Sequence, residues 1–171
     1  MMVIRQLVAI VALPFVVVVL IPLRIARRGD ATLAPADSAP RAAAQLAGVV
    51  LLLIGAWLFT SSLRRFVVDG RGTLAPWDPP RTLVVRGPYR RVRNPMISGV
   101  VCMLFAEALV LGSRVQLEWA VVFLLVNAVY IPLLEEPFLR ARFGADYDEY
   151  CRNVPRLFPR FHPWHAKGDA A

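Results

Sequence analysis

The sequence predicts an all-α integral membrane protein that forms a single domain over residues 1–171. Hydrophobic residues make up 57% of the chain and its mean hydropathy is +0.54. Soluble domains are usually about 45–50% apolar. The apolar residues also gather into four blocks with the charges between them, as expected where a charge at the bilayer centre costs about 2.5–3.5 kcal/mol.

Each apolar block is about as long as a membrane-spanning helix. At a rise of about 1.5 Å per residue, each can just cross a hydrocarbon core of about 30 Å. For the first block a signal peptide is the competing interpretation; we favour a retained helix, because the block contains Pro14 and has no clear small-residue cleavage site. The predicted helices cover residues 6–23, 46–63, 96–112 and 117–134.

The connections between the blocks differ in length. Gly29–Pro40 is predicted to be a loop, and the short turn Ser113–Gln116 should join the last two helices into an antiparallel hairpin. Residues 64–95 contain prolines and glycines that exclude one continuous helix, and long loops are usually functional or disordered. The polar tail, residues 135–171, is predicted to be helical to about Arg152 and extended beyond it.

The basic residues orient the predicted helices. With four spans, fifteen basic residues lie on the side of the long loop and both termini, and five basic residues lie on the other side. The positive-inside rule therefore places the long loop and both termini in the cytoplasm. The five on the opposite side oppose the rule, and they are Arg24, Arg27, Arg28, Arg41 and Arg114.

The charge and the cysteines exclude other classes of function. A net charge of +8 on a soluble protein would suggest nucleic acid, but here the arginines flank apolar blocks and should contact headgroups. Cys102 lies in an apolar block and Cys151 in the tail, so we expect no disulfide. His162 and His165 lack zinc-site spacing, so we expect no metal site.

Two polar segments flank the predicted hairpin. Gly87–Pro95 leads into the third helix, and Glu135 and Glu136 follow the fourth. Because a hairpin returns to the membrane face that it left, the two segments should be neighbours at the cytoplasmic boundary. The carboxylates would then face three arginines: Arg90, Arg91 and Arg93.

This combination of side chains suits a zwitterionic nucleoside such as S-adenosylmethionine. Arginines can bind an anionic group, Gly87 permits close backbone approach, and a helix start offers free N–H groups. The carboxylates could accept ribose hydroxyls, and Tyr89, Tyr147 and Tyr150 could stack on a base. A structural salt-bridge cluster explains the same residues equally well from physics alone.

The same segments resemble the isoprenylcysteine carboxyl methyltransferase and phospholipid methyltransferase superfamily. The resemblance covers about Gly70 to Pro159, and the Gly72–Pro80 segment is similar to bacterial members. Its motifs are Gly87-Pro88-Tyr89-x-x-Val92-Arg93-Asn94-Pro95-Met96, the pair Glu135-Glu136, and the tail Phe143-Gly144…Tyr147…Tyr150…Val154-Pro155-Arg156.

The resemblance implies a polytopic helical enzyme that binds S-adenosylmethionine with cytoplasmic segments. Catalytic roles would fall to Arg93, orienting an anionic group, and to Glu136, as the base for a thiol or amine acceptor. Asn94 stands where many members have histidine, and its amide cannot titrate near neutral pH. The implied cofactor-binding residues are Gly87, Pro88, Tyr89, Arg93, Asn94, Pro95, Glu135 and Glu136.

The expected activity is methyl transfer to a lipophilic or small carboxylate, thiol or amine acceptor, in a bacterial inner membrane. A non-catalytic membrane protein that keeps the fold, or a membrane reductase with a related helical core, is the alternative. Glu107 in the third helix could contact substrate or pair with Arg114. Ser98, Gly99 and Ala106 leave room for a lipid-facing groove or for close helix packing.

Overall fold

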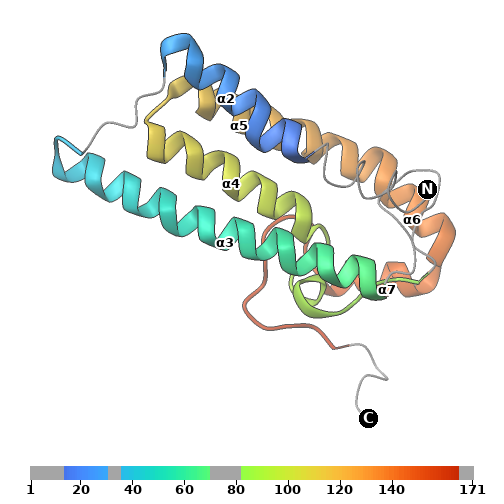
Figure 1. The fold of residues 1–171 in the computed structure, drawn as a ribbon. Coiled ribbons are helices and arrows are strands. Elements are labelled where there is room, and N and C mark those ends of the chain that lie inside the picture. Colours follow the sequence, from blue (N-terminus) through green and yellow to red (C-terminus); the bar gives the residue numbers. More distant parts are fainter. Residues whose placement is uncertain (1–13, 31–35, 70–81, 166–171) are drawn as a thin grey trace.

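A computed structural model describes residues 14–30, 36–69 and 82–165. These residues form long helices packed side by side, followed by two short helices and an extended tail (Figure 1). The described part contains no β-strand, which agrees with the predicted all-α class.

The first described segment is one helix with two wider, π-helical turns. It comprises η1 (Val16–Leu20), α2 (Ile21–Ile25) and η2 (Ala26–Asp30). The predicted helix 6–23 is too short at its carboxyl end, because arginine is a good helix former and carries the helix through Arg24, Arg27 and Arg28. Residues 6–13 of that prediction lie outside the described residues.

The second helix, α3 (Ala39–Asp69), has 31 residues and extends beyond the predicted range 46–63 at both ends. Alanines extend it at the amino end, and Arg64 and Arg65 continue it rather than ending it. The predicted loop therefore begins after Asp69, and residues 70–81 of that loop lie outside the described residues. A charged pair ends an apolar block but does not end a helix.

The predicted hairpin is confirmed. It consists of α4 (Pro95–Leu111) and α5 (Arg114–Tyr130). Its turn is shorter than predicted, because Gly112 takes a left-handed conformation (φ 63°) and the Ser113 hydroxyl accepts a hydrogen bond from the Gln116 N–H at 3.2 Å.

The last predicted helix continues without a break past residue 134. The π-helical turn η4 (Ile131–Glu135) and α6 (Glu136–Phe143) extend α5. Gly144, with a φ of 56°, then ends this helix, and α7 (Ala145–Asn153) follows. The helical part of the tail is thus confirmed, as two helices rather than one.

The α4 helix lies between α3 and α5, while α2 packs beside α5 (Figure 1). A core of Val100, Leu104 and Ala120 joins these helices. Contact between α3 and α4 is closest where two glycines meet: a Cβ atom on Gly99 would lie 2.8 Å from the Gly55 carbonyl oxygen. Close packing, rather than a lipid-facing groove, therefore explains Gly99.

Among the described residues, two helices are long and apolar enough to cross a membrane, Ala39–Arg65 and Arg114–Phe143. Few of their residues are buried inside the protein, and large apolar side chains such as Leu53 and Leu125 are exposed. A third apolar helix, α4, has 17 residues. The two long helices support a membrane location, and four spans remain a prediction.

Candidate functional site

The two ends of the hairpin meet in a nearly buried cluster of charges. The Arg93 Nη1 donates to Glu136 Oε1 at 2.9 Å. Arg156, from the tail, donates from Nε to the same oxygen at 2.5 Å and from Nη2 to Oε2 at 3.1 Å. The Glu136 side chain is only 7% exposed and that of Arg93 is 11% exposed. We refer to these residues as the Arg93–Glu136–Arg156 cluster.

Main-chain hydrogen bonds hold the two segments of this cluster together. The Arg93 N–H donates to the Pro155 carbonyl at 2.8 Å, and the Asn94 N–H donates to the Arg156 carbonyl at 3.2 Å. One turn further, the Ser98 hydroxyl donates to the Leu157 carbonyl at 2.7 Å. The tail is therefore fixed against the first turn of α4, and Ser98 serves this contact rather than an open groove.

Opposite charges in the cluster favour the ionised forms of its three side chains. The hydrogen bond to Glu136 raises the pKa of the Arg156 guanidinium above its usual value. Burial of the Glu136 carboxyl is offset by two guanidinium groups, both of which donate to its Oε1. Both of its oxygens accept hydrogen bonds, which makes Glu136 a weak proton acceptor. Arg156 was not among the site residues predicted from the sequence, although it lies in a motif that carried the resemblance.

One donor of the cluster has no partner in the part of the chain that the structure describes. The Arg93 Nη1 also contacts Cys151 Sγ at 2.9 Å, but the Arg93 Nε is buried without a hydrogen bond within the described residues. Buried N–H donors in native proteins are nearly always satisfied, so such a group commonly marks a place for a ligand or a water molecule.

The Gly87–Arg90 segment forms a single 3₁₀ turn, η3, ahead of α4. Gly87 has a φ of 57°, a conformation that favours glycine, and an added Cβ atom there would lie 3.4 Å from the Arg65 Nε. Pro88 is buried beneath this turn. Asn94 precedes Pro95, the first residue of α4, and its side chain does not cap the helix.

Two of the three tyrosines are used differently from the sequence interpretation. Tyr147 and Tyr150 are each 2% exposed and pack with Val154, Leu83 and Trp164. The Tyr150 hydroxyl donates to the Tyr89 carbonyl at 2.7 Å, and burial raises the pKa of Tyr150. Tyr147 and Tyr150 therefore form the core that fixes the tail, and they are too enclosed to stack on a ligand. Burial, and then the charge of Glu135, raise the pKa of Tyr89.

Glu107 does not form the pair considered from the sequence. Arg114 instead binds Glu118, one turn along the same helix, at 3.0 Å. The Glu107 Oε2 is buried and has no hydrogen-bond partner within the described residues. Glu107 lies thirteen residues, or about three and a half turns, beyond Asn94 along α4, which separates it from the charge cluster.

Comparison with known proteins identifies the family. The sequence profile of the phospholipid methyltransferases matches residues 43–146, more than half of the chain. The chain belongs to the phospholipid methyltransferase family. The matched range includes Arg93 and Glu136, and family membership together with the apolar helices indicates an integral membrane protein of the methyltransferase class.

A curated relative points in the same direction. Methanethiol S-methyltransferase 2 of Bradyrhizobium diazoefficiens is 34% identical over 101 residues, a stretch that covers 57% of this chain. The chain spans about a third, 36%, of the length of that relative. No solved structure matches the chain.

Proposed function

We propose that this protein is an S-adenosylmethionine-dependent methyltransferase that works beside the Arg93–Glu136–Arg156 cluster. Family membership supports the class of reaction. The observation that carries the location is the Arg93 Nε–H, which is buried without a partner among the described residues although the same guanidinium is bound to Glu136. A ligand carboxylate would satisfy this donor with a charge-assisted hydrogen bond.

The neighbouring residues fit the remaining parts of such a cofactor. Gly87 allows the left-handed turn that leads into this region, and the α4 helix begins here with a positive dipole end. Glu135 is the carboxylate not occupied by the cluster, and it suits ribose hydroxyls. The residues that would hold S-adenosylmethionine are Gly87, Pro88, Tyr89, Arg93, Asn94, Pro95, Glu135 and Glu136. The cofactor supplies a methyl group on a sulfonium, which transfers without further activation.

The charges around the site favour an acceptor that reacts as an anion. Arg93 and Arg156 create a positive environment, which lowers the pKa of a nearby thiol and favours a carboxylate. The acceptor's lone pair would form the bond to the methyl carbon, and the electron pair of the broken S–CH₃ bond would stay on the cofactor sulfur. A thiol proton would pass to water. Similarity to a methanethiol S-methyltransferase supports a sulfur acceptor.

Glu136 then has a positioning role. The sequence suggested it as the base, but both of its oxygens are occupied by guanidinium groups, which suits it to orient Arg93. Arg93 in turn would orient the anionic group of the cofactor or acceptor. An amine acceptor gains nothing from this arrangement, because the positive product would face two arginines.

The proposal includes four spans in a bacterial inner membrane, with both termini in the cytoplasm. The cluster then lies at the cytoplasmic boundary, where polar ligands arrive from water. Lipophilic acceptors would reach it from the bilayer, and small acceptors from either phase.

Methyl transfer to matched acceptors tests the proposal. Purified full-length protein in detergent would receive methyl-labelled S-adenosylmethionine with methanethiol, octanethiol, acetate or methylamine. We expect labelled thioether as the main product, and comparison of the two thiols shows whether an apolar tail helps. Arg93→Ala should lower the rate of methyl transfer at least about tenfold. Arg152 is an exposed arginine on α7, and Arg152→Ala should leave the rate unchanged. Equal transfer to the amine would contradict the proposed acceptor class.

A further inference from the structure

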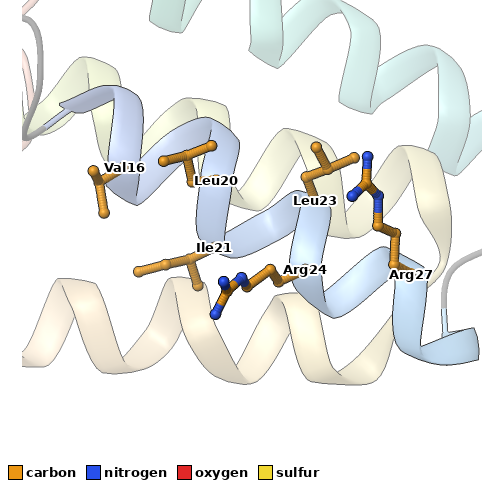
Figure 2. A pocket seen from close by; sticks show the side chains of 6 residues that line it. All are labelled: Val16, Leu20, Ile21, Leu23, Arg24 and Arg27. Carbon is orange, nitrogen blue, oxygen red and sulfur yellow. The ribbon is translucent and has the colours of Figure 1, made fainter.

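A separate cavity lies at the end of the bundle opposite the Arg93–Glu136–Arg156 cluster. It has a volume of about 310 Å³, and its lining residues all come from the first helical segment. Four are apolar and two are arginines: Val16, Leu20, Ile21, Leu23, Arg24 and Arg27 (Figure 2). We refer to this cavity as the α2 groove.

Contacts with α5 fix the position of the α2 groove. The Gln116 Nε2 donates to the Pro22 carbonyl at 3.4 Å, and the Trp119 Nε1 donates to the Val17 carbonyl at 3.2 Å. The groove therefore lies beside the start of α5, whereas Glu136 lies about twenty residues later in the same continuous helix. At about 1.5 Å per residue, this places the groove about 30 Å from the cluster.

The groove changes in character along its length. Val16 and Leu20 line its amino-terminal part, and Arg24 and Arg27 follow toward Asp30. In Figure 2 the Arg24 side chain runs back along the segment beside Ile21, whereas the Arg27 side chain points away from the segment on the other side. A groove that is apolar at its amino-terminal end and carries two exposed arginines one helical turn apart at the other suits an acyl chain that carries a phosphate at its head.

Charge supports an anionic occupant. Neither Arg24 nor Arg27 takes part in an ion pair within the described residues, and both are exposed. The carboxylate of Glu118 on the neighbouring helix is already bound to Arg114 at 3.0 Å. The arginines at this end also oppose the positive-inside rule, and a bound anionic lipid would offset their charge.

We propose that the α2 groove binds an anionic phospholipid, with the phosphate at Arg24 and Arg27 and an acyl chain along Val16 and Leu20. The lipid belongs to the leaflet opposite the reaction site. It is therefore a structural ligand of the helix bundle and not a methyl acceptor. This proposal rests on the proposed four-span topology and does not depend on the proposed methyltransferase activity.

Native mass spectrometry of the delipidated full chain in detergent tests this site. Dioleoylphosphatidylglycerol is the probe, and dioleoylphosphatidylcholine is the zwitterionic comparison. We expect the parent protein to bind one phosphatidylglycerol molecule tightly and phosphatidylcholine with lower affinity. The affinity for phosphatidylglycerol should be at least about tenfold lower in the variant Arg24→Gln/Arg27→Gln. The matched control Arg28→Gln/Arg114→Gln removes the same charge from the same end outside the groove, and its affinity should stay within about twofold.

Three results would overturn the proposal. One is equal loss in the two double variants, since this would show a general charge effect. Another is the absence of any preference for phosphatidylglycerol over phosphatidylcholine. The third is displacement of the lipid by inorganic phosphate at a similar concentration, since this would show a simple anion site. Circular dichroism and the melting temperature of each variant in detergent identify a variant that has failed to fold. If the Arg24→Gln/Arg27→Gln variant does not fold, Leu20→Asn replaces it. Leu20→Asn leaves both arginines in place and should weaken phosphatidylglycerol binding by the same factor.

Discussion

Replacing Glu136 with glutamine tests the charge cluster that joins the two ends of the hairpin. The amide keeps the volume of the side chain but removes the charge that faces Arg93 and Arg156. Arg93 is 11% exposed, so water cannot replace its lost partner at 2.9 Å. Arg156 is 36% exposed and can turn toward water.

The cost follows from these two environments. Removal of one partner from a buried ion pair costs about 3–5 kcal/mol, and we take the lower end because Arg93 keeps its contact with Cys151. An exposed pair contributes about 0–1 kcal/mol, which is the share of Arg156. We therefore expect Glu136→Gln to lower the free energy of unfolding by about 3–4 kcal/mol.

Denaturant unfolding of the purified protein in mild detergent, followed by circular dichroism, provides the measurement. Glu118→Gln is the matched control, because it breaks the Arg114–Glu118 pair, whose side chains are 90% and 59% exposed. That variant should lose no more than about 1 kcal/mol. A loss below about 1 kcal/mol for Glu136→Gln, or equal losses for the two variants, would refute the reasoning.

Three further predictions concern helix packing, the burial of Tyr150 and the membrane topology. Gly99→Leu should destabilise the protein by at least about 1–3 kcal/mol in the same assay, because even a Cβ atom there would lie 2.8 Å from the Gly55 carbonyl oxygen; unchanged stability would show that α3 and α4 are not in contact. Burial raises the pKa of Tyr150, so the neutral phenol stabilises the fold below about pH 10, and this contribution is lost as the pH rises further. The free energy of unfolding between about pH 10 and 12 should therefore fall less steeply in Tyr150→Phe than in the parent protein. Parallel curves for the two proteins would show that Tyr150 is not enclosed. Reporter fusions after Arg71 and after Ala171 should both report the cytoplasm, and a periplasmic signal from either would overturn the topology.

The sequence predicted the parts of this structure that depend on hydrophobic pattern and chain direction. The α4–α5 hairpin was predicted from two apolar blocks and a short turn. The ion pair of Arg93 and Glu136 confirms the proximity that follows from a hairpin returning to its own membrane face. Their roles in binding and catalysis remain predictions.

Other features depended on contacts that no local pattern contains. Arg64 and Arg65 mark where the apolar block ends, but α3 continues to Asp69, since helix propensity is independent of membrane depth. Arg156 joins the site only because the tail folds back against α4, twenty residues after Glu136 in the sequence. Gly99 has the same pattern whether it lines a groove or meets another helix, and only its closeness to Gly55 decides between them.

Calorimetric titration of the purified protein with S-adenosylhomocysteine tests the central claim most directly. The account predicts saturable binding by the parent protein and by Arg152→Ala, with affinity at least about tenfold weaker in Arg93→Ala. Binding that is equal in all three proteins, or no heat and no thermal shift at saturating ligand, would contradict a cofactor site at the Arg93–Glu136–Arg156 cluster.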